Sequence, residues 1–417
     1  MVNGMNKRIK TRWMSLELNS PYVIASLTLV SNVTLSKHVD YYKKVCDMGA
    51  GAIVLPSVNP QSTGDPEKNE TIADCLTFHT GLNGHHQMGF TVLGPTVPNI
   101  VSVDYGINLA NRVKACCESI PVLGSVANIG TDLEIISAVR RMCETGINGL
   151  ELNFSCPNVI AMGVNQYEPT IRQLQEIRKI CDLPISLKIT PYQDYSGLVS
   201  SLNSEVDGLT LTNAYIGLIP PDINRDNGCP FDRRTEWAPS GVYGPFERML
   251  TFKHLFDYQH LASEKGLSLA CVGGIVSADE GIQALMLGAD VVQLSSAVLW
   301  NGIPILGKFN EVLENYLDGK GLDSVNQLHK SAIPHVKNCT DALLKPVSRK
   351  MKVNDEKCKK CRSCFCCNRL CIAISQKEDR TVVIDQNLCS GCQMCRQLCP
   401  NSAIEEMAEV LQIATAL

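Results

Sequence analysis

Short apolar runs alternate with amphipathic stretches from the N-terminal region to about residue 320. Eight runs have the length of buried strands: Tyr22–Ala25, Ala52–Leu55, Pro121–Ser125, Gly149–Phe154, Ile185–Ile189, Gly208–Leu211, Leu267–Val272 and Val291–Leu294. Between these runs, apolar residues recur at the spacing of a helix, most clearly in Val39–Met48, Leu133–Thr145, Thr170–Cys181 and Ala278–Leu287. This alternation predicts an α/β fold, a (β/α)8 TIM barrel, because parallel strands need helical crossovers; a doubly wound sheet is the alternative.

Two long stretches interrupt this rhythm, residues 56–104 and residues 213–245. Both follow the ends of predicted strands, which is where the active sites of barrels lie. Long insertions in a compact domain are usually functional, and we expect additional small strands in the first one.

The cysteines divide the chain further. Ten of the 20 lie between Cys358 and Cys399. Dense clustering without an export signal indicates metal ligation in a reducing compartment, and we expect the scattered cysteines to be mostly buried small apolar residues. The predicted domains are a barrel over residues 1–320, a linker over 321–350 and a small metal domain over 351–417.

The last four cysteines of the cluster have the C-x2-C-x2-C-x3-C-P spacing of a bacterial ferredoxin, which predicts a [4Fe–4S] cluster. They are Cys389, Cys392, Cys395 and Cys399, followed by Pro400. The fourth cysteine of such a run ligates the other cluster of a two-cluster domain.

The upstream cysteines allow two registers. The first reproduces the spacing but has Ile372 in place of proline; its members are Cys361, Cys364, Cys367 and Cys371. The second uses Cys358, Cys361 and Cys364, places Asn368 at the fourth position and requires Cys367 or Cys371 to serve. Spacing favours the first register, and either one predicts two [4Fe–4S] clusters.

Polar residues follow the predicted barrel strands. Asn153 and Asn158 can donate and accept together, which suits the imide edge of a pyrimidine, and Cys156 between them can exchange a proton with carbon. Lys188 closes an apolar strand and needs a negative partner, which a reduced flavin would supply. Thr212 and Asn213 could complete a ring of amides. Strands seven and eight end in Gly273-Gly274 and in Ser295-Ser296, where barrels bind phosphate.

In this order, the motifs resemble those of the dihydroorotate dehydrogenase superfamily of FMN enzymes, over about residues 15–317. A barrel followed by a two-cluster ferredoxin is also similar to the catalytic subunit of bacterial dihydropyrimidine dehydrogenases. One departure is Pro56, which stands just after strand two where the family usually has lysine.

The resemblance implies a mechanism in which hydride passes between the flavin and C6 of a pyrimidine while Cys156 exchanges the C5 proton. It implies that the substrate is held by Asn153, Asn158, Thr212 and Asn213. It also implies that FMN is held by Ser26, Lys188, Gly244, Gly273, Gly274, Ser295 and Ser296. Because no Gly-x-Gly-x-x-Gly fingerprint is present, electrons would reach NAD(P)H through an FAD-containing subunit or a ferredoxin.

Composition limits the partners. A formal net charge of −4 argues against binding to nucleic acid or to anionic membranes, and no apolar run is long enough for a membrane helix. We therefore expect a cytoplasmic, oligomeric enzyme. The reading favoured at this point is a dihydropyrimidine dehydrogenase acting on uracil or thymine. The alternatives are a dihydroorotate dehydrogenase, an FMN and iron–sulfur reductase of another substrate, and an electron-transfer protein without catalysis.

Overall fold

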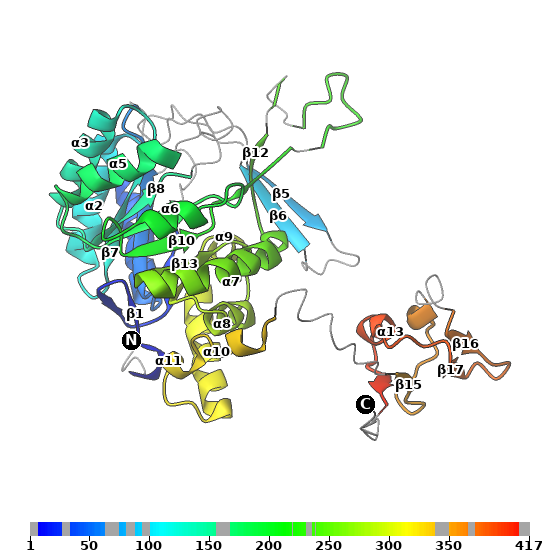
Figure 1. Cartoon of the computed structure of the whole chain (residues 1–417). Helices are drawn as coiled ribbons and strands as arrows, with labels where there is room; N and C mark the ends of the chain where they lie inside the picture. The colour runs from blue at the N-terminus through cyan, green and yellow to red at the C-terminus, as the bar shows by residue number, and fades with distance from the viewer. Residues whose placement is uncertain are drawn as a thin grey trace. The chain divides into compact units, whose positions relative to one another are not determined.

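The structure is a computed structural model (Figure 1) that divides into two compact units, Met1–His335 and Val336–Leu417. It describes residues 7–26, 34–62, 75–80, 88–93, 101–155, 167–218, 220–230, 236–237, 239–337, 350–365 and 372–407. The first unit contains every predicted strand of the barrel, and the second contains the cysteine cluster.

The first unit is built on a closed barrel of eight parallel strands. They are β3 (Tyr22–Ile24), β4 (Ala52–Val58), β7 (Val122–Ala127), β8 (Gly149–Asn153), β9 (Ile185–Ile189), β10 (Gly208–Leu211), β13 (Ser268–Val272) and β14 (Val291–Leu294). The sequence prediction of a TIM barrel is thus confirmed, and each of the eight apolar runs forms one barrel strand. Between Val54 and Ser57 the pairing of β4 with β7 shifts register, which re-aims the end of β4.

Helices cover the outside of the barrel (Figure 1). They are α1 (Leu35–Asp47), α2 (Val103–Cys116), α3 (Asp132–Cys143), α5 (Tyr167–Arg178), α6 (Ser196–Ser201), α7 (Arg248–Lys265), α8 (Ala278–Met286), α9 (Ser296–Asn301), α10 (Ile305–Lys320) and α11 (Val325–Leu328). Local chemistry sets some of their ends: Thr131 and Glu134 form a capping box on α3, and Ser277 and Glu280 form one on α8.

The inside of the barrel is filled from its amino-terminal end. A hairpin of β1 (Thr11–Trp13) and β2 (Leu16–Leu18) follows a short 3-10 helix, η1 (Lys7–Ile9). Its Trp13 is fully buried and packs with barrel residues such as Leu123 and Val291. The opposite, carboxyl end of the barrel is therefore the end where polar side chains can gather.

The two insertions form a second sheet (Figure 1). Its strands, in spatial order, are β11 (Tyr215–Gly217), β12 (Ser240–Tyr243), β6 (Met88–Leu93) and β5 (Cys75–Thr80). The strands expected in the first insertion are present, and Val242 of the second insertion pairs with Val92 of the first. This pairing brings together two segments that flank different barrel strands.

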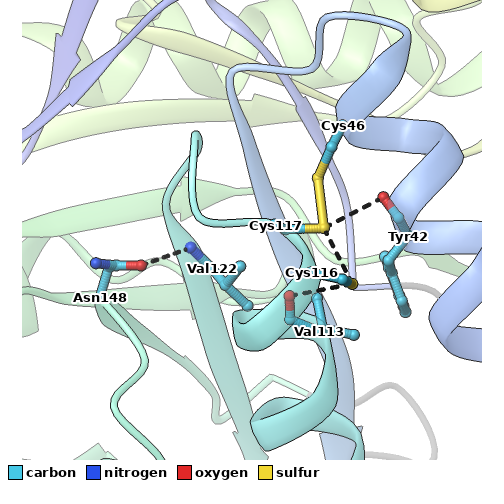
Figure 2. Close-up of a disulfide and its surroundings, with 7 residues drawn as sticks. All are labelled: Tyr42, Cys46, Val113, Cys116, Cys117, Val122 and Asn148. Carbon is cyan, nitrogen blue, oxygen red and sulfur yellow. Dashed lines mark hydrogen bonds between the residues drawn. A yellow bond between two sulfur atoms is a disulfide. The ribbon is translucent and has the colours of Figure 1, made fainter.

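Two of the scattered cysteines do not behave as the sequence predicts. Cys46 and Cys117 form a disulfide that joins the ends of α1 and α2, with 6.2 Å between their Cα atoms (Figure 2). The Cys116 Sγ lies 3.7 Å from the Cys117 Sγ. The reason is packing: α1 and α2 are neighbours on the barrel, so residues distant in sequence meet at their ends.

The barrel unit continues beyond α10. The His329 ring nitrogen Nε2 lies 3.0 Å from the Gly288 carbonyl oxygen, and the Ala332 N–H donates to the Met286 carbonyl. A further 3-10 helix, η5 (Ile333–His335), ends this unit. The unit thus includes part of the range for which the sequence suggested a linker.

The second unit is small and has two short antiparallel sheets. β15 (Met351–Val353) pairs with β18 (Ile404–Glu406), and β16 (Ile374–Gln376) pairs with β17 (Val382–Ile384). The one-turn helix α13 (Met394–Gln397) lies within the ferredoxin motif. Across the described parts of both units, no helix is long and apolar enough to cross a membrane.

Candidate active site

A buried ionic cluster lies at the carboxyl end of the barrel. Lys188 of β9 is 5% exposed, and Glu151 of β8 is 0% exposed. The Lys188 Nζ lies 3.5 Å from the Glu151 Oε1. The other carboxylate oxygen accepts hydrogen bonds from the Gln293 Nε2 at 2.7 Å and from the Thr210 hydroxyl at 3.0 Å. Four barrel strands thus contribute to one charged network.

Lys188 has the negative partner that the sequence predicts it to need. Among the described residues that partner is Glu151. The pair was hidden because Glu151 and Lys188 are on different strands. Their side chains meet only because β8 pairs in parallel with β9, with Glu151 beside Ser186.

Amides and hydroxyls form a second network at the same end. The Asn213 Nδ2 donates to the Asn153 Oδ1 at 2.8 Å and to the Ser155 carbonyl at 2.9 Å. The Asn153 Nδ2 in turn donates to the Ser57 Oγ at 3.1 Å. Two predicted substrate residues, Asn153 and Asn213, are therefore in direct contact.

Hydroxyl groups extend this network in a way that the sequence did not suggest. The Ser57 Oγ lies 2.7 Å from the Ser125 Oγ and 3.2 Å from the Ser26 Oγ. Ser26, expected beside the cofactor, therefore adjoins the amide network. Ser57 follows Pro56, the position of the missing lysine, and lies at the register shift of β4, which is visible only in the structure.

At the end of the barrel where the sequence predicts phosphate binding, which we call the phosphate end, Gly273 and Gly274 pack against the start of α7. Gly273 and Gly274 have φ of +126° and +73°, which favour glycine. A Cβ on Gly274 would lie 2.4 Å from the Arg248 backbone nitrogen, and one on Gly273 would lie 2.6 Å from the Thr251 Oγ1. The buried Thr251 Oγ1 has no hydrogen-bond partner among the described residues.

The ends of β14 and β10 also contribute residues to the phosphate end. Ser296 is buried and begins α9, with Ser295 preceding it. Thr212 is buried, and its backbone N–H donates to the Val272 carbonyl at 2.9 Å, so it joins β10 to β13. Three features of this end fit a flavin that bears a phosphate: the closely packed Gly273-Gly274 backbone, the unpartnered Thr251 hydroxyl and the buried Lys188 ammonium. Lys188, Gly273, Gly274 and Ser296 would hold such a flavin.

Glu247 is a buried carboxyl group in this region that the sequence analysis did not single out. It is 2% exposed and lies in a short 3-10 helix, η4 (Pro245–Glu247), directly before α7. Its carboxylate accepts N–H groups from Tyr215 at 3.3 Å and from Gly244 at 3.4 Å. Burial raises the pKa of Glu247 to about 8, although these N–H groups and Lys188 oppose the shift.

Several predicted residues lie outside the described part of the chain. They are Cys156, Asn158, Cys367 and Cys371. Their roles remain predictions from the sequence.

In the small unit, the described cysteines surround one apolar core. Cys364 and Cys395 are buried within it, while Cys358, Cys389 and Cys399 pack against it. Cys361 and Cys392 are exposed. No group of three or more histidine, cysteine or acidic side chains among the described residues is gathered closely enough for a single metal ion.

The two halves of the small unit repeat the same backbone conformation 31 residues apart. The Cys358 N–H donates to the Asn354 carbonyl at 3.0 Å, and the Cys389 N–H donates to the Asp385 carbonyl at 2.9 Å. Positive φ angles follow at the same offsets: Lys360 and Arg362 in the first half, and Gly391 and Gln393 in the second. By conformation, Cys358 is thus the counterpart of Cys389.

Burial raises the pKa of Cys364 to about 11, and the thiols of Cys395, Cys399 and Cys358 add to the shift. Upstream and downstream cysteines of the small unit are therefore neighbours in space.

Comparison with known protein families identifies the barrel. The family model described as dihydroorotate dehydrogenase matches residues 37–317. The chain belongs to the dihydroorotate dehydrogenase family. It is accordingly an oxidoreductase that acts on a CH–CH group. A second model, a 4Fe-4S binding domain, matches residues 382–405, which include all four cysteines of the ferredoxin run.

Relatives with curated names agree with this assignment. Three of them are called dihydroorotate dehydrogenase B (NAD(+)), catalytic subunit. The one from Thermoplasma volcanium is 23% identical over 78% of this chain and 98% of its own length. The one from Saccharolobus solfataricus is 23% identical over 74% and 94%, and the one from Petrotoga mobilis is 25% identical over 51% and 71%.

Proposed function

We propose that this chain is the catalytic component of an enzyme that interconverts dihydroorotate and orotate. The observation that carries the proposal is the similarity to a dihydroorotate dehydrogenase catalytic subunit over 98% of that protein's length. The contact between Asn153 and Asn213 supports it, because paired amides can donate to and accept from the polar edge of a pyrimidine. The comparisons therefore support this alternative better than the uracil or thymine reading.

The proposal gives these residues different roles. Asn153, Asn213 and Asn158 hold the ring, and Cys156 takes or returns the proton at C5. FMN, when bound, would supply the hydride chemistry at C6. The Lys188 ammonium, held by Glu151, presents a fixed positive charge to the cofactor in a site with little water, where such a charge acts most strongly.

Anaerobic reduction of the flavin tests the substrate. The full-length protein is purified without oxygen, and dihydroorotate, dihydrouracil and dihydrothymine are added separately while the absorbance of oxidised flavin is followed. We expect bleaching with dihydroorotate alone. Bleaching by dihydrouracil or dihydrothymine alone would overturn the proposal, as would a bound flavin that none of the three reduces.

Dihydropyrimidine dehydrogenase chemistry is the second candidate, and one observation favours it. The alignment with the Thermoplasma volcanium subunit covers 78% of this chain, so a substantial part lies outside it. The 4Fe-4S match at residues 382–405 lies outside residues 37–317, the range matched by the dihydroorotate dehydrogenase model, and a barrel followed by a ferredoxin-type domain is the architecture similar to dihydropyrimidine dehydrogenases. The dihydrouracil and dihydrothymine arms of the same experiment distinguish this candidate.

The small unit would carry electrons through two [4Fe–4S] clusters. The 31-residue repeat supports the register in which Cys358, Cys361 and Cys364 act with Cys399 on one cluster. Cys389, Cys392 and Cys395 would hold the other, with Cys367 or Cys371 as the fourth ligand. Electrons would then pass to a separate NAD-binding subunit or to a ferredoxin, because the chain has no dinucleotide fingerprint.

Iron content tests this register. The anaerobic protein should contain about eight irons, as two cubes require, and Cys358→Ala should lose about half of them. The matched control is Cys229→Ala, which removes a buried thiol of the barrel unit and should change nothing. Unchanged iron in Cys358→Ala would instead support the register that begins at Cys361.

A further inference from the structure

The glycine loops at the phosphate end of the barrel are already occupied by an anionic group of the chain itself. Glu247 accepts the backbone N–H of Gly244 at 3.4 Å and that of Tyr215 at 3.3 Å. The Gly274 N–H also stabilises its ionised form. Backbone N–H groups of glycine loops beside the start of a helix are the donors that bind phosphate in barrels of this kind.

The carboxylate lies directly against the loop that follows β13. A Cβ on Gly273 would lie 3.6 Å from the Glu247 Oε2, with no residue between them. Because Gly274 is packed against the Arg248 backbone, the loop has little freedom to move away from the carboxylate. A phosphate at these N–H groups would thus be a close neighbour of Glu247.

We propose that Glu247 is a built-in competitor for the phosphate of the flavin, so that the phosphate binds well only when the carboxyl group is neutral. The inference rests on the proposed use of FMN and adds to it a residue that controls cofactor affinity. Binding of the phosphate dianion above neutral pH is then accompanied by the uptake of one proton by Glu247. Since nothing else is exchanged, protons and charges balance.

The pH range in which this competition acts follows from burial. Burial raises the pKa of Glu247 to about 8, so the group is mostly neutral at pH 7 and mostly ionised at pH 9. The second pKa of a phosphate monoester is about 6, so the flavin phosphate is a dianion over this whole range. Repulsion between the two anions should therefore grow from pH 7 to pH 9.

The titratable groups on the neighbouring elements whose pKa values are shifted are all shifted away from the range between pH 7 and pH 9. The pKa of Tyr215 is raised to about 12 by burial and by Glu247, and the pKa of Tyr192 is raised by burial. Burial raises the pKa of Cys271 on β13 to about 12 and lowers that of His254 on α7 below its ordinary value. The remaining charges are Lys188 on β9 and the ion pair of Arg248 with Glu280.

If Glu247 had only a structural role, a different result would be expected. A carboxylate that reaches back to an N–H group before a helix also has the geometry of a helix cap. If capping were its only role, removing the charge would change stability and leave the pH dependence of cofactor affinity as it was. The test therefore compares affinities across pH and not activities.

The experiment is a titration of the flavin-free full-length protein with FMN, followed by quenching of flavin fluorescence between pH 7 and pH 9. With a pKa of about 8, linkage predicts that the Kd of the wild type rises about tenfold over this range. In Glu247→Gln the Kd should change less than about twofold and should lie below the wild-type value at pH 9.

Two controls make the result specific. Glu264→Gln makes the same charge change at the exposed far end of α7 and should follow the wild type. Riboflavin has no phosphate, so its Kd should be the same at both pH values in wild type and Glu247→Gln. The melting temperature of each variant reports folding separately.

The outcomes separate this inference from the proposed function. If FMN binds but wild type and Glu247→Gln have the same pH dependence, the competition is overturned while the flavin enzyme stands. A pH dependence that riboflavin shares also overturns it. If FMN binds to neither protein at any pH, both the inference and the proposed cofactor are wrong.

Discussion

In the barrel, the Glu151 carboxylate accepts a hydrogen bond from Gln293, which lies 142 residues further along the chain. In the cysteine-rich unit, the Cys358 N–H bonds to Asn354, four residues earlier, and this turn recurs at Cys389. The first site is assembled by strand pairing, whereas the second is assembled by local turns. A single change should therefore cost much in the barrel and little in the small unit.

The largest effect is expected for the residue to which the proposed mechanism gives the proton transfer. Cys156→Ser should lower turnover by about 10²- to 10⁴-fold, the usual contribution of a general acid or base. FMN content and iron content should remain those of the wild type. Stopped-flow measurement of flavin reduction gives the rate. Cys229→Ser is the control thiol variant, and equal rates for all three proteins would remove Cys156 from the mechanism.

The next effect concerns the buried ion pair. Lys188→Ala should destabilise the barrel by about 3–5 kcal/mol, because it leaves the fully buried Glu151 without its cation. Urea unfolding followed by tryptophan fluorescence isolates the barrel, since all three tryptophans lie in that unit.

Two further variants test whether the loss of stability in Lys188→Ala comes from a buried charge. Lys253→Ala breaks an exposed pair with Asp257 and should cost at most about 1 kcal/mol. The double variant Lys188→Met with Glu151→Gln should recover part of the lost stability, because no buried charge remains. A loss in Lys188→Ala no larger than in Lys253→Ala would mean that the barrel end is not a buried charged site.

A smaller effect is expected in the amide network. Asn213→Ala removes the donor to Asn153 and Ser155, and an unpaired buried polar group costs about 1–3 kcal/mol. If the same amides hold the ring, the substrate concentration for half-maximal flavin reduction should rise by about 10- to 100-fold. An unchanged value would show that Asn213 serves the fold alone.

The smallest effect is expected in the local turns of the small unit. The Asn354 Oδ1 accepts the N–H groups of Glu356 at 3.2 Å and Lys357 at 3.3 Å. Asn354→Ala should cost this unit about 0.5–1.5 kcal/mol, measured as an earlier loss of cluster absorbance in urea. The tryptophan transition of the barrel should not move. Asp385→Ala, at the repeat-related position, should behave alike; a much larger loss in either would contradict local assembly.

The sequence predicted the two regions to different extents, because the barrel site is assembled by strand pairing and the cysteine-rich unit by local turns. The barrel strands were found because each is a separate apolar run between amphipathic segments. Asn153, Lys188 and Asn213 were singled out as candidates because they end such runs. Glu151, Ser57 and Glu247 were missed as site residues. Glu151 and Ser57 contact side chains on other strands, and Glu247 contacts the backbone of Tyr215, 32 residues earlier, in addition to the nearby Gly244.

In the cysteine-rich unit, spacing alone identified the metal and the ligand type, because three thiolates of one loop must reach one cube. For the upstream cysteines, spacing alone favoured the register that begins at Cys361. The repeated turns at Asn354 and Asp385 favour Cys358, and these are visible only in the backbone.

The sequence by itself determined the fold class, the two-part organisation and the iron–sulfur motif, because hydrophobic periodicity and cysteine spacing are local properties of a chain. Only the tertiary structure decided which polar groups neutralise one another. Pairing of β8 with β9 gives Lys188 its partner Glu151, and packing of α7 on the Gly273-Gly274 loop places Glu247 beside the loop that we propose binds phosphate. Burial converts such contacts into function, since charges removed from water interact strongly with the few groups that remain beside them.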